Sequence, residues 1–124
     1  MFIYFLQRTF ISFYQLSLEK LKNIKQIKIT KTKPGSSRHL YVIRTKYRDK
    51  LVRYLLNKKI SCQIHYPYSL NRLKPFIKYA KKHKNLKNSK KWSTECLSLP
   101  IHSKMKINDA NQVANELNKF FLKK

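Results

Sequence analysis

The sequence has almost no glycine. Gly35 is the only glycine among 124 residues. Phosphate-binding loops of the Walker and dinucleotide types need several glycines, because their backbone turns tightly and approaches the phosphates closely. The chain therefore contains no such loop.

Acidic residues and cysteines are also scarce. The five acidic residues are Glu19, Asp49, Glu95, Asp109 and Glu116. They form no closely spaced pair of the kind used in acid–base catalysis. Cys62 and Cys96 stand far apart without CxxC or Cys/His spacing, which argues against a zinc site and against a disulfide framework. We expect two small buried thiols, reduced in a cytoplasmic setting.

No apolar run is long enough to span a membrane. The apolar and aromatic start, residues 1–14, is interrupted by Gln7 and Arg8. It falls short of the roughly 18–20 residues that a membrane helix needs. It also lacks the basic start and the small-residue cleavage site of a signal peptide. We expect no membrane partner.

The chain is strongly basic, with a net charge of +24. Such a charge can indicate nucleic-acid binding. However, arginine supplies 6 of the 29 basic residues and lysine the other 23, and Asn, Ile, Tyr and Phe are also abundant. Selection for nucleic-acid contact favours the bidentate arginine, whereas an A/T-rich genome enriches all of these residues together. We favour this compositional bias and expect only weak, non-specific polyanion binding.

The apolar pattern predicts alternating helices and strands. Helices are expected over residues 10–26, 48–57, 73–81 and 108–121, and strands over 39–45, 61–66 and 95–99. Residues 31–37 are typical of a turn, and the lysine-rich residues 81–91 of a solvated loop. The 39–45 strand is apolar on both faces, which predicts an interior strand. The order predicts a small α/β domain with a three-stranded sheet covered by helices.

Periodicity also predicts which side chains are buried. In the 48–57 helix the expected buried residues are Leu51, Val52, Leu55 and Leu56. In the 108–121 helix they are Ala110, Val113, Ala114, Leu117 and Phe121, with Asn108 or Asp109 as the N-cap. In the 61–66 strand, Cys62, Ile64 and Tyr66 are expected to share one face.

His65 is the most informative single residue, because it lies on the polar face near a predicted strand end, where α/β domains bind ligands. A lone histidine is nevertheless more often a hydrogen-bonded surface residue. His39, His83 and His102 appear scattered, and Ser98 lacks the flanking glycines of a nucleophile elbow. These residues alone support no more than a small basic α/β domain.

Three motifs carry a family resemblance. The first two are Tyr41-Val42-Ile43-Arg44 and Arg48-Asp49 with Leu51, Leu55 and Ile60, which lead to His65-Tyr66-Pro67. The third is Leu97-Ser98-Leu99-Pro100 with His102. Their order and gaps resemble the carboxy-terminal small domain of the DegT/DnrJ/StrS-type pyridoxal-phosphate-dependent sugar aminotransferases. Lys59 stands where the family usually has glycine in the left-handed conformation, and we expect Asn57 to supply that conformation instead.

The resemblance implies the small domain of a fold-type-I aminotransferase over residues 36–124. Residues 1–35 would be a helix and linker to a large domain that is missing from this chain. In the family that domain carries the aldimine lysine and holds pyridoxal phosphate. The chain alone would therefore bind no cofactor and be inactive as a remnant or split subunit. His65 and Tyr66 become candidate sugar-binding residues, and no catalytic, cofactor-binding or metal-binding residue is assigned.

The wider implication is an enzyme of nucleotide-sugar transamination in polysaccharide or surface-glycan biosynthesis, a class whose members are usually homodimers. A different class stays open at this point. The chain could be a stand-alone basic binding module with non-specific nucleic-acid affinity.

Overall fold

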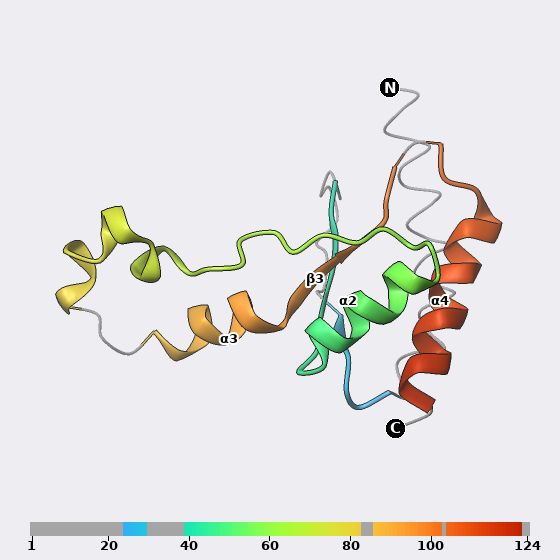
Figure 1. Ribbon diagram of the computed structural model, residues 1–124, viewed down its shortest axis with the longest axis horizontal. Helices are drawn as coiled ribbons and strands as arrows, with labels where there is room; N and C mark the ends of the chain where they lie inside the picture. Colours follow the sequence, from blue (N-terminus) through green and yellow to red (C-terminus); the bar gives the residue numbers. More distant parts are fainter. Residues whose placement is uncertain (1–23, 30–38, 83–85, 103, 123–124) are drawn as a thin grey trace.

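The computed structural model describes residues 24–29, 39–82, 86–102 and 104–122 (Figure 1). The strands are β1 (Lys28–Ile29), β2 (Tyr41–Arg44) and β3 (Cys96–Leu99). The α-helices are α2 (Arg48–Asn57), α3 (Lys87–Glu95) and α4 (Ile107–Leu122). Three short 3-10 helices cover Leu70–Arg72, Lys74–Phe76 and Tyr79–Lys82.

The sheet has three antiparallel strands in the order β1-β2-β3. Val42 pairs with Ser98, and Ile43 pairs with both Ile29 and Leu97. The small α/β class, the three-stranded sheet and the interior position of β2 are therefore confirmed.

The prediction of a strand over residues 61–66 is wrong, and β1 is the third strand of the sheet instead. In the 61–66 segment only Gln63 pairs, through an isolated bridge to Ser98 on β3. The pairing stops there because Tyr66 has a φ of 60° and Pro67 has no N–H to donate. The segment thus covers the outer edge of β3 at one point.

The hydrophobic core lies between the sheet and two of the helices. It contains Tyr41 and Ile43 from β2, Leu97 and Leu99 from β3, and Leu51 and Leu55 from α2. The contribution of α4 is larger and consists of Ala110, Val113, Ala114, Leu117, Phe120 and Phe121. In Figure 1, α2 and α4 lie close to the sheet, whereas α3 extends away from it.

Helix α2 has the predicted bounds. Leu51 and Leu55 are buried and Val52 is half-buried, as expected, but Leu56 is 54% exposed. The prediction for Leu56 is wrong because Leu51 and Leu55, four residues apart, already form the stripe that faces the core.

Lys59, two residues after the last residue of α2, has a φ of 58°. Its N–H donates to Leu56 O at 2.9 Å, and the Ile60 N–H donates to Leu55 O at 2.9 Å. This pair of bonds is the Schellman motif, whose left-handed residue is usually glycine. The expectation that Asn57 would take this conformation is wrong, because Asn57 is the last residue of α2 and the motif requires the left-handed residue two positions later.

Helix α4 confirms the predicted helix and its buried residues, but the N-cap prediction is wrong by two or three positions. The helix begins at Ile107, so Lys106 is the N-cap. The Asp109 carboxylate accepts a bond of 2.8 Å from the Lys106 N–H, which is the return half of a capping box.

The chain between Pro67 and β3 differs most from prediction. A single helix over 73–81 is wrong, since 3-10 turns replace it and Phe76 and Ile77 are exposed. A loop over 81–91 is also wrong, because α3 begins at Lys87. α3 is held by side chains from elsewhere: Arg48 donates to Ser93 O and Arg44 pairs with Glu95.

Most of the predicted 10–26 helix lies outside the described residues, and residues 24–27 form a turn closed by the Ile27 N–H and Ile24 O at 3.1 Å. The predicted turn at 31–37 and His83 also lie outside them. Within the described ranges, no helix is both long and apolar enough to cross a membrane.

Candidate functional site

The candidate site is built around His65, which is fixed against β3 through its side chain and its backbone. Nδ1 of His65 lies 2.8 Å from the Ser98 hydroxyl oxygen. The Cys96 thiol donates to the His65 carbonyl at 3.4 Å. Two backbone bonds of 3.0 and 2.8 Å between Gln63 and Ser98 hold the segment just before it. His65 is therefore oriented by β3, although it does not belong to the sheet.

The hydrogen bond to Ser98 leaves the other ring nitrogen of His65 for a ligand. If Ser98 donates to Nδ1, the neutral ring carries its proton on Nε2 and Nε2 is a donor. If Nδ1 carries the proton, Nε2 is an acceptor. Either tautomer can bind a hydroxyl group, because a hydroxyl both donates and accepts.

Tyr66 is the second candidate residue and has a strained backbone. Its φ of 60° lies in the left-handed region, and it precedes Pro67. This conformation costs a residue with a Cβ about 1–2 kcal/mol. Such strain is found preferentially at functional sites, where the surrounding structure imposes it.

The Tyr66 side chain is 79% exposed. The prediction that it shares one face of a strand with Cys62 and Ile64 is wrong, because the φ of Tyr66 interrupts the strand alternation. The phenol ring is instead exposed to solvent, and Tyr66 is not among the residues that line the pocket of His65.

His65 lines a pocket of about 330 Å³, which we call the histidine pocket. Its wall also includes His39, His102, Ser98 and Cys62. Three of the four histidines of the chain therefore surround one hollow, although they are 26 and 37 residues apart in sequence. The interpretation of His39 and His102 as scattered residues is therefore wrong. The signal available for His102 and Ser98 was the Leu97–His102 motif, which contains both.

The chemistry of the histidine pocket is that of binding rather than nucleophilic attack. Ser98 is buried and bonded to His65, but no carboxylate of the described residues lines the pocket to complete a catalytic triad. Both thiols are free, and burial raises the pKa of Cys62 and of Cys96, which keeps them protonated at neutral pH. Among the described residues, no group of three or more metal-ligating side chains is assembled.

An exposed apolar arm leads away from this site. The chain leaves the body of the fold after Tyr66, runs out through the three 3-10 helices and returns along α3 (Figure 1). We define the arm as residues 66–95 without 83–85. Its large exposed apolar side chains are Tyr66, Tyr68, Leu70, Phe76, Ile77, Tyr79, Leu86 and Trp92. Apolar side chains concentrated on one projecting segment are typical of an interaction surface.

Solved fold-type-I aminotransferases share this three-stranded antiparallel sheet under two packed helices over a small part of their length. DesV from S. venezuelae, solved with a ketimine intermediate, has this fold, with a TM-score of 0.79 and 23% identity over 88% of our chain and 30% of DesV. PseC from Helicobacter pylori, an aminotransferase of pseudoaminic acid biosynthesis, matches with a TM-score of 0.79 and 19% identity over 96% of our chain and 33% of PseC.

The family model of the DegT/DnrJ/EryC1/StrS aminotransferases matches residues 4–118. The chain therefore belongs to this family, and the predicted resemblance is confirmed. NtdA from Bacillus subtilis, solved with bound PMP, is a further structural relative, with a TM-score of 0.76 and 18% identity over 98% of our chain and 28% of NtdA. The chain spans about a third of the length of these structures. No curated protein sequence matches it significantly.

The described residues do not fit the cofactor of this family. A lysine that forms a Schiff base with pyridoxal phosphate is activated by desolvation or by a neighbouring cation that lowers its pKa. Among the residues that the structure describes, no lysine lines the histidine pocket, and every lysine whose side chain is described is exposed. The described part of the chain therefore supplies no lysine suited to a Schiff base with the cofactor.

Proposed function

We propose that this chain serves as the small domain of a pyridoxal-phosphate-dependent aminotransferase that acts on nucleotide-linked keto-sugars. Residues 36–124 would form that domain and residues 1–35 the helix and linker toward a large domain. The large domain would carry the aldimine lysine, so this chain would be inactive alone. The setting would be polysaccharide or surface-glycan biosynthesis in the cytoplasm, in an enzyme that works as a homodimer.

The observation that carries the proposal is the geometry of His65 and Tyr66. Ser98 orients the imidazole at 2.8 Å, and the left-handed backbone exposes the adjacent phenol. An imidazole nitrogen and a phenol are suited to a sugar, because one hydrogen-bonds a hydroxyl group while the other can also pack its ring on a sugar face. We assign sugar contacts to these two residues.

The exposed apolar arm supports a large-domain partner. Eight large apolar side chains on residues 66–92 are exposed. The chain covers 30% of DesV and 33% of PseC, so most of each relative lies beyond the matched part. An arm that starts at the sugar-binding residues would place them at the boundary between the two domains, where ligand sites are commonly formed.

The test is to translate the DNA upstream of the coding sequence and to purify its product together with this chain. We expect an open frame that encodes a large domain with a cofactor lysine, and transamination of a keto-sugar only when both parts are present. Upstream DNA that encodes no such domain, together with full solubility and no large-domain partner in purification from the native cell, would contradict the proposal.

Substitution of His65 tests the site within the reconstituted enzyme. We expect His65→Ala to lower kcat/KM for the sugar about tenfold or more, which corresponds to the loss of one hydrogen bond to a bound ligand. Lys50→Ala, on an exposed helix position away from the pocket, is the control and should leave kcat/KM unchanged.

A further inference from the structure

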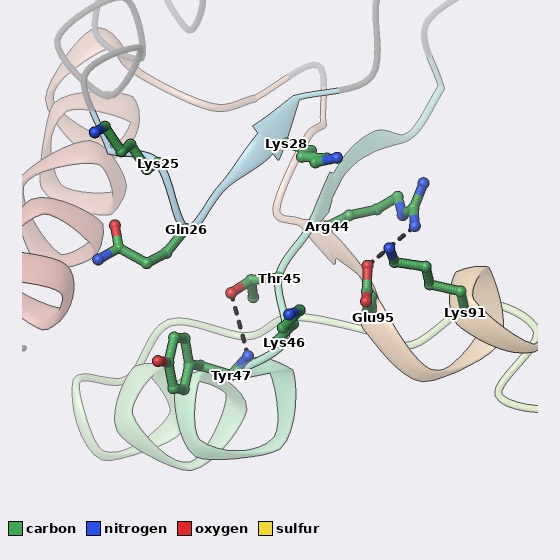
Figure 2. Close-up of a pocket in the computed structure, with 9 residues that line it drawn as sticks. All are labelled: Lys25, Gln26, Lys28, Arg44, Thr45, Lys46, Tyr47, Lys91 and Glu95. Atoms are coloured by element: carbon green, nitrogen blue, oxygen red, sulfur yellow. Dashed lines mark hydrogen bonds and ion pairs between the residues drawn. The ribbon is translucent and has the colours of Figure 1, made fainter. Parts of the chain in front are cut away.

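A second hollow, with a different chemical character, lies at the other end of β2. The histidine pocket includes His39 and Leu40, just before β2, whereas this hollow includes Arg44, its last residue. Its volume is about 410 Å³. We call it the basic pocket. The charged residues that line it are Lys25, Lys28, Arg44, Lys46, Lys91 and Glu95 (Figure 2).

The charge of the basic pocket is almost uncompensated. Glu95 is the single carboxylate among the lining residues, and it already pairs with Arg44 at 3.0 Å. In the part of the chain that the structure describes, no ion pair joins any of the four lysines to a carboxylate. Glu95 is thus the one described carboxylate beside five basic lining residues, and Figure 2 shows Lys28, Arg44 and Lys91 on the same side of the hollow, with Lys25 directed away from them.

Lysine-rich composition does not account for this pocket. Five of its nine lining residues are basic, against 29 of 124 in the whole chain, which is more than twice the average share. The cations also come from separate segments: the turn before β1, β1 itself, β2, the loop after β2, and α3. The tertiary fold has brought them together, since no two of these segments form one continuous basic run.

One basic side chain of the pocket, Arg44, is held in place where β2 meets α3. Arg44 packs over the Trp92 ring, with its guanidinium carbon 4.9 Å from the ring centroid, and also pairs with Glu95. Figure 2 shows the Arg44 and Lys91 side chains converging beside Glu95, with Lys28 and Lys46 nearby. A side chain that is already ordered, as Arg44 is, loses little entropy when a ligand binds.

Concave surfaces lined by one sign of charge focus the electric field and concentrate counter-ions. Like charges that line one hollow repel one another, and a bound anion relieves this repulsion. A ligand with several negative charges within a small volume is attracted more strongly by this field, and offsets the repulsion better, than a single carboxylate or sulfate. Lysine is a common ligand of phosphate groups, where it acts as a point charge.

We propose that the basic pocket binds a small oligophosphate, that is, a diphosphate or triphosphate group. Its volume lies within the range of about 300–1,000 Å³ that is typical of small-molecule sites. A nucleic-acid backbone fits less well, because it is bound by an extended groove or stripe of cations rather than by one hollow. The proposal is independent of the aminotransferase function and concerns the end of β2 opposite to His65.

The experiment is a calorimetric titration of the full chain with inorganic pyrophosphate and with orthophosphate at the same ionic strength. The test variant is Lys28→Ala/Lys46→Ala/Lys91→Ala. The matched control is Lys50→Ala/Lys74→Ala/Lys104→Ala, which removes the same charge from exposed lysines outside the basic pocket. Circular dichroism verifies that both variants are folded.

We expect pyrophosphate to bind more tightly than orthophosphate, and the pocket variant to lose about tenfold or more in affinity while the control loses less than about twofold. Equal losses in the two variants would mean that dispersed charge binds the anion, which would overturn the proposal. If the triple variant does not fold, Lys46→Ala and Lys91→Ala are measured singly, and each must weaken pyrophosphate more than Lys50→Ala does.

Two further ligands identify the source of the phosphate. If UDP binds more tightly than pyrophosphate, the pocket takes the diphosphate of a nucleotide; equal affinities indicate a free oligophosphate, and both results support the proposal. Single-stranded RNA that binds more tightly than either, and that loses affinity selectively in the pocket variant, would assign the basic pocket to nucleic acid and overturn it.

Discussion

Replacing Lys59 by glycine is expected to stabilise the chain. Lys59 has a φ of 58°, which costs a residue with a Cβ about 1–2 kcal/mol. The two hydrogen bonds of the motif join the Lys59 N–H to Leu56 O and the Ile60 N–H to Leu55 O, both at 2.9 Å. Both bonds use backbone atoms, so glycine retains them and removes only the steric cost.

The expected gain is smaller than the strain, because glycine has more conformational freedom in the unfolded chain. That entropy costs about 0.5–1 kcal/mol. The difference is a net stabilisation of about 0.5–1 kcal/mol. For a domain of this size, such a gain raises Tm by roughly 2–6 °C.

Urea denaturation followed by circular dichroism measures this free energy, with Lys59→Ala as the matched control. Alanine removes the same positive charge from a chain of net charge +24 but keeps the Cβ, so it isolates the charge contribution. We expect Lys59→Gly to be more stable than Lys59→Ala by about 0.5–1 kcal/mol. If the two variants have equal midpoints, the left-handed backbone at Lys59 is not strained and the reasoning is refuted.

Three other predictions follow from the structure and the family assignment. Hydrogen bonds from Lys119 and Tyr54 to the buried Glu116 lower the pKa of its carboxyl group. These bonds therefore stabilise the fold at pH values above the ordinary glutamate pKa, and the stabilisation is lost as the pH falls through the lowered pKa. The stability difference between wild type and Glu116→Gln, about 1–3 kcal/mol at pH 7, should shrink toward pH 3 in urea titrations, and a constant difference would contradict this. The purified chain should show no saturable Schiff base with pyridoxal phosphate, and a single borohydride-reducible adduct at one lysine would disprove that expectation. We expect residues 1–9 to pack against the proposed large domain, so deleting them should reduce self-association of the chain in size-exclusion chromatography. An unchanged elution volume would refute the linker interpretation.

The local sequence was sufficient to predict a helix or strand where the apolar residues of that segment face the core directly. The bounds of α2 and the buried residues of α4 follow from a 3.6-residue periodicity of apolar residues. The apolar face that this periodicity produces packs onto the sheet. The strand at 41–44 follows from its apolar residues on both faces, which need cover on both sides. The three family motifs could be recognised for the same reason, since each lies within one element or at its end.

The 66–95 arm could not be predicted in this way. Phe76 and Ile77 have helical spacing but no core to pack on, so the expected helix is replaced by 3-10 turns. α3 has the composition of a loop and is stabilised by Arg44 and Arg48 from distant elements. The sequence of residues 87–95 by itself does not indicate that these two arginines will contact the helix.

The candidate site also has a part that the sequence predicted and a part that only the tertiary structure revealed. The sequence by itself determined the family and the buried residues of α4, because these depend on short contiguous motifs and local periodicity, whereas the roles of His65 and Tyr66 stay predictions. Only the tertiary structure decided that His39 and His102 join His65 around one pocket, and that lysines from several segments share another. The physical reason is that each pocket forms at an end of β2, where the antiparallel partners and the following loops converge, and such convergence depends on strand register rather than on local periodicity.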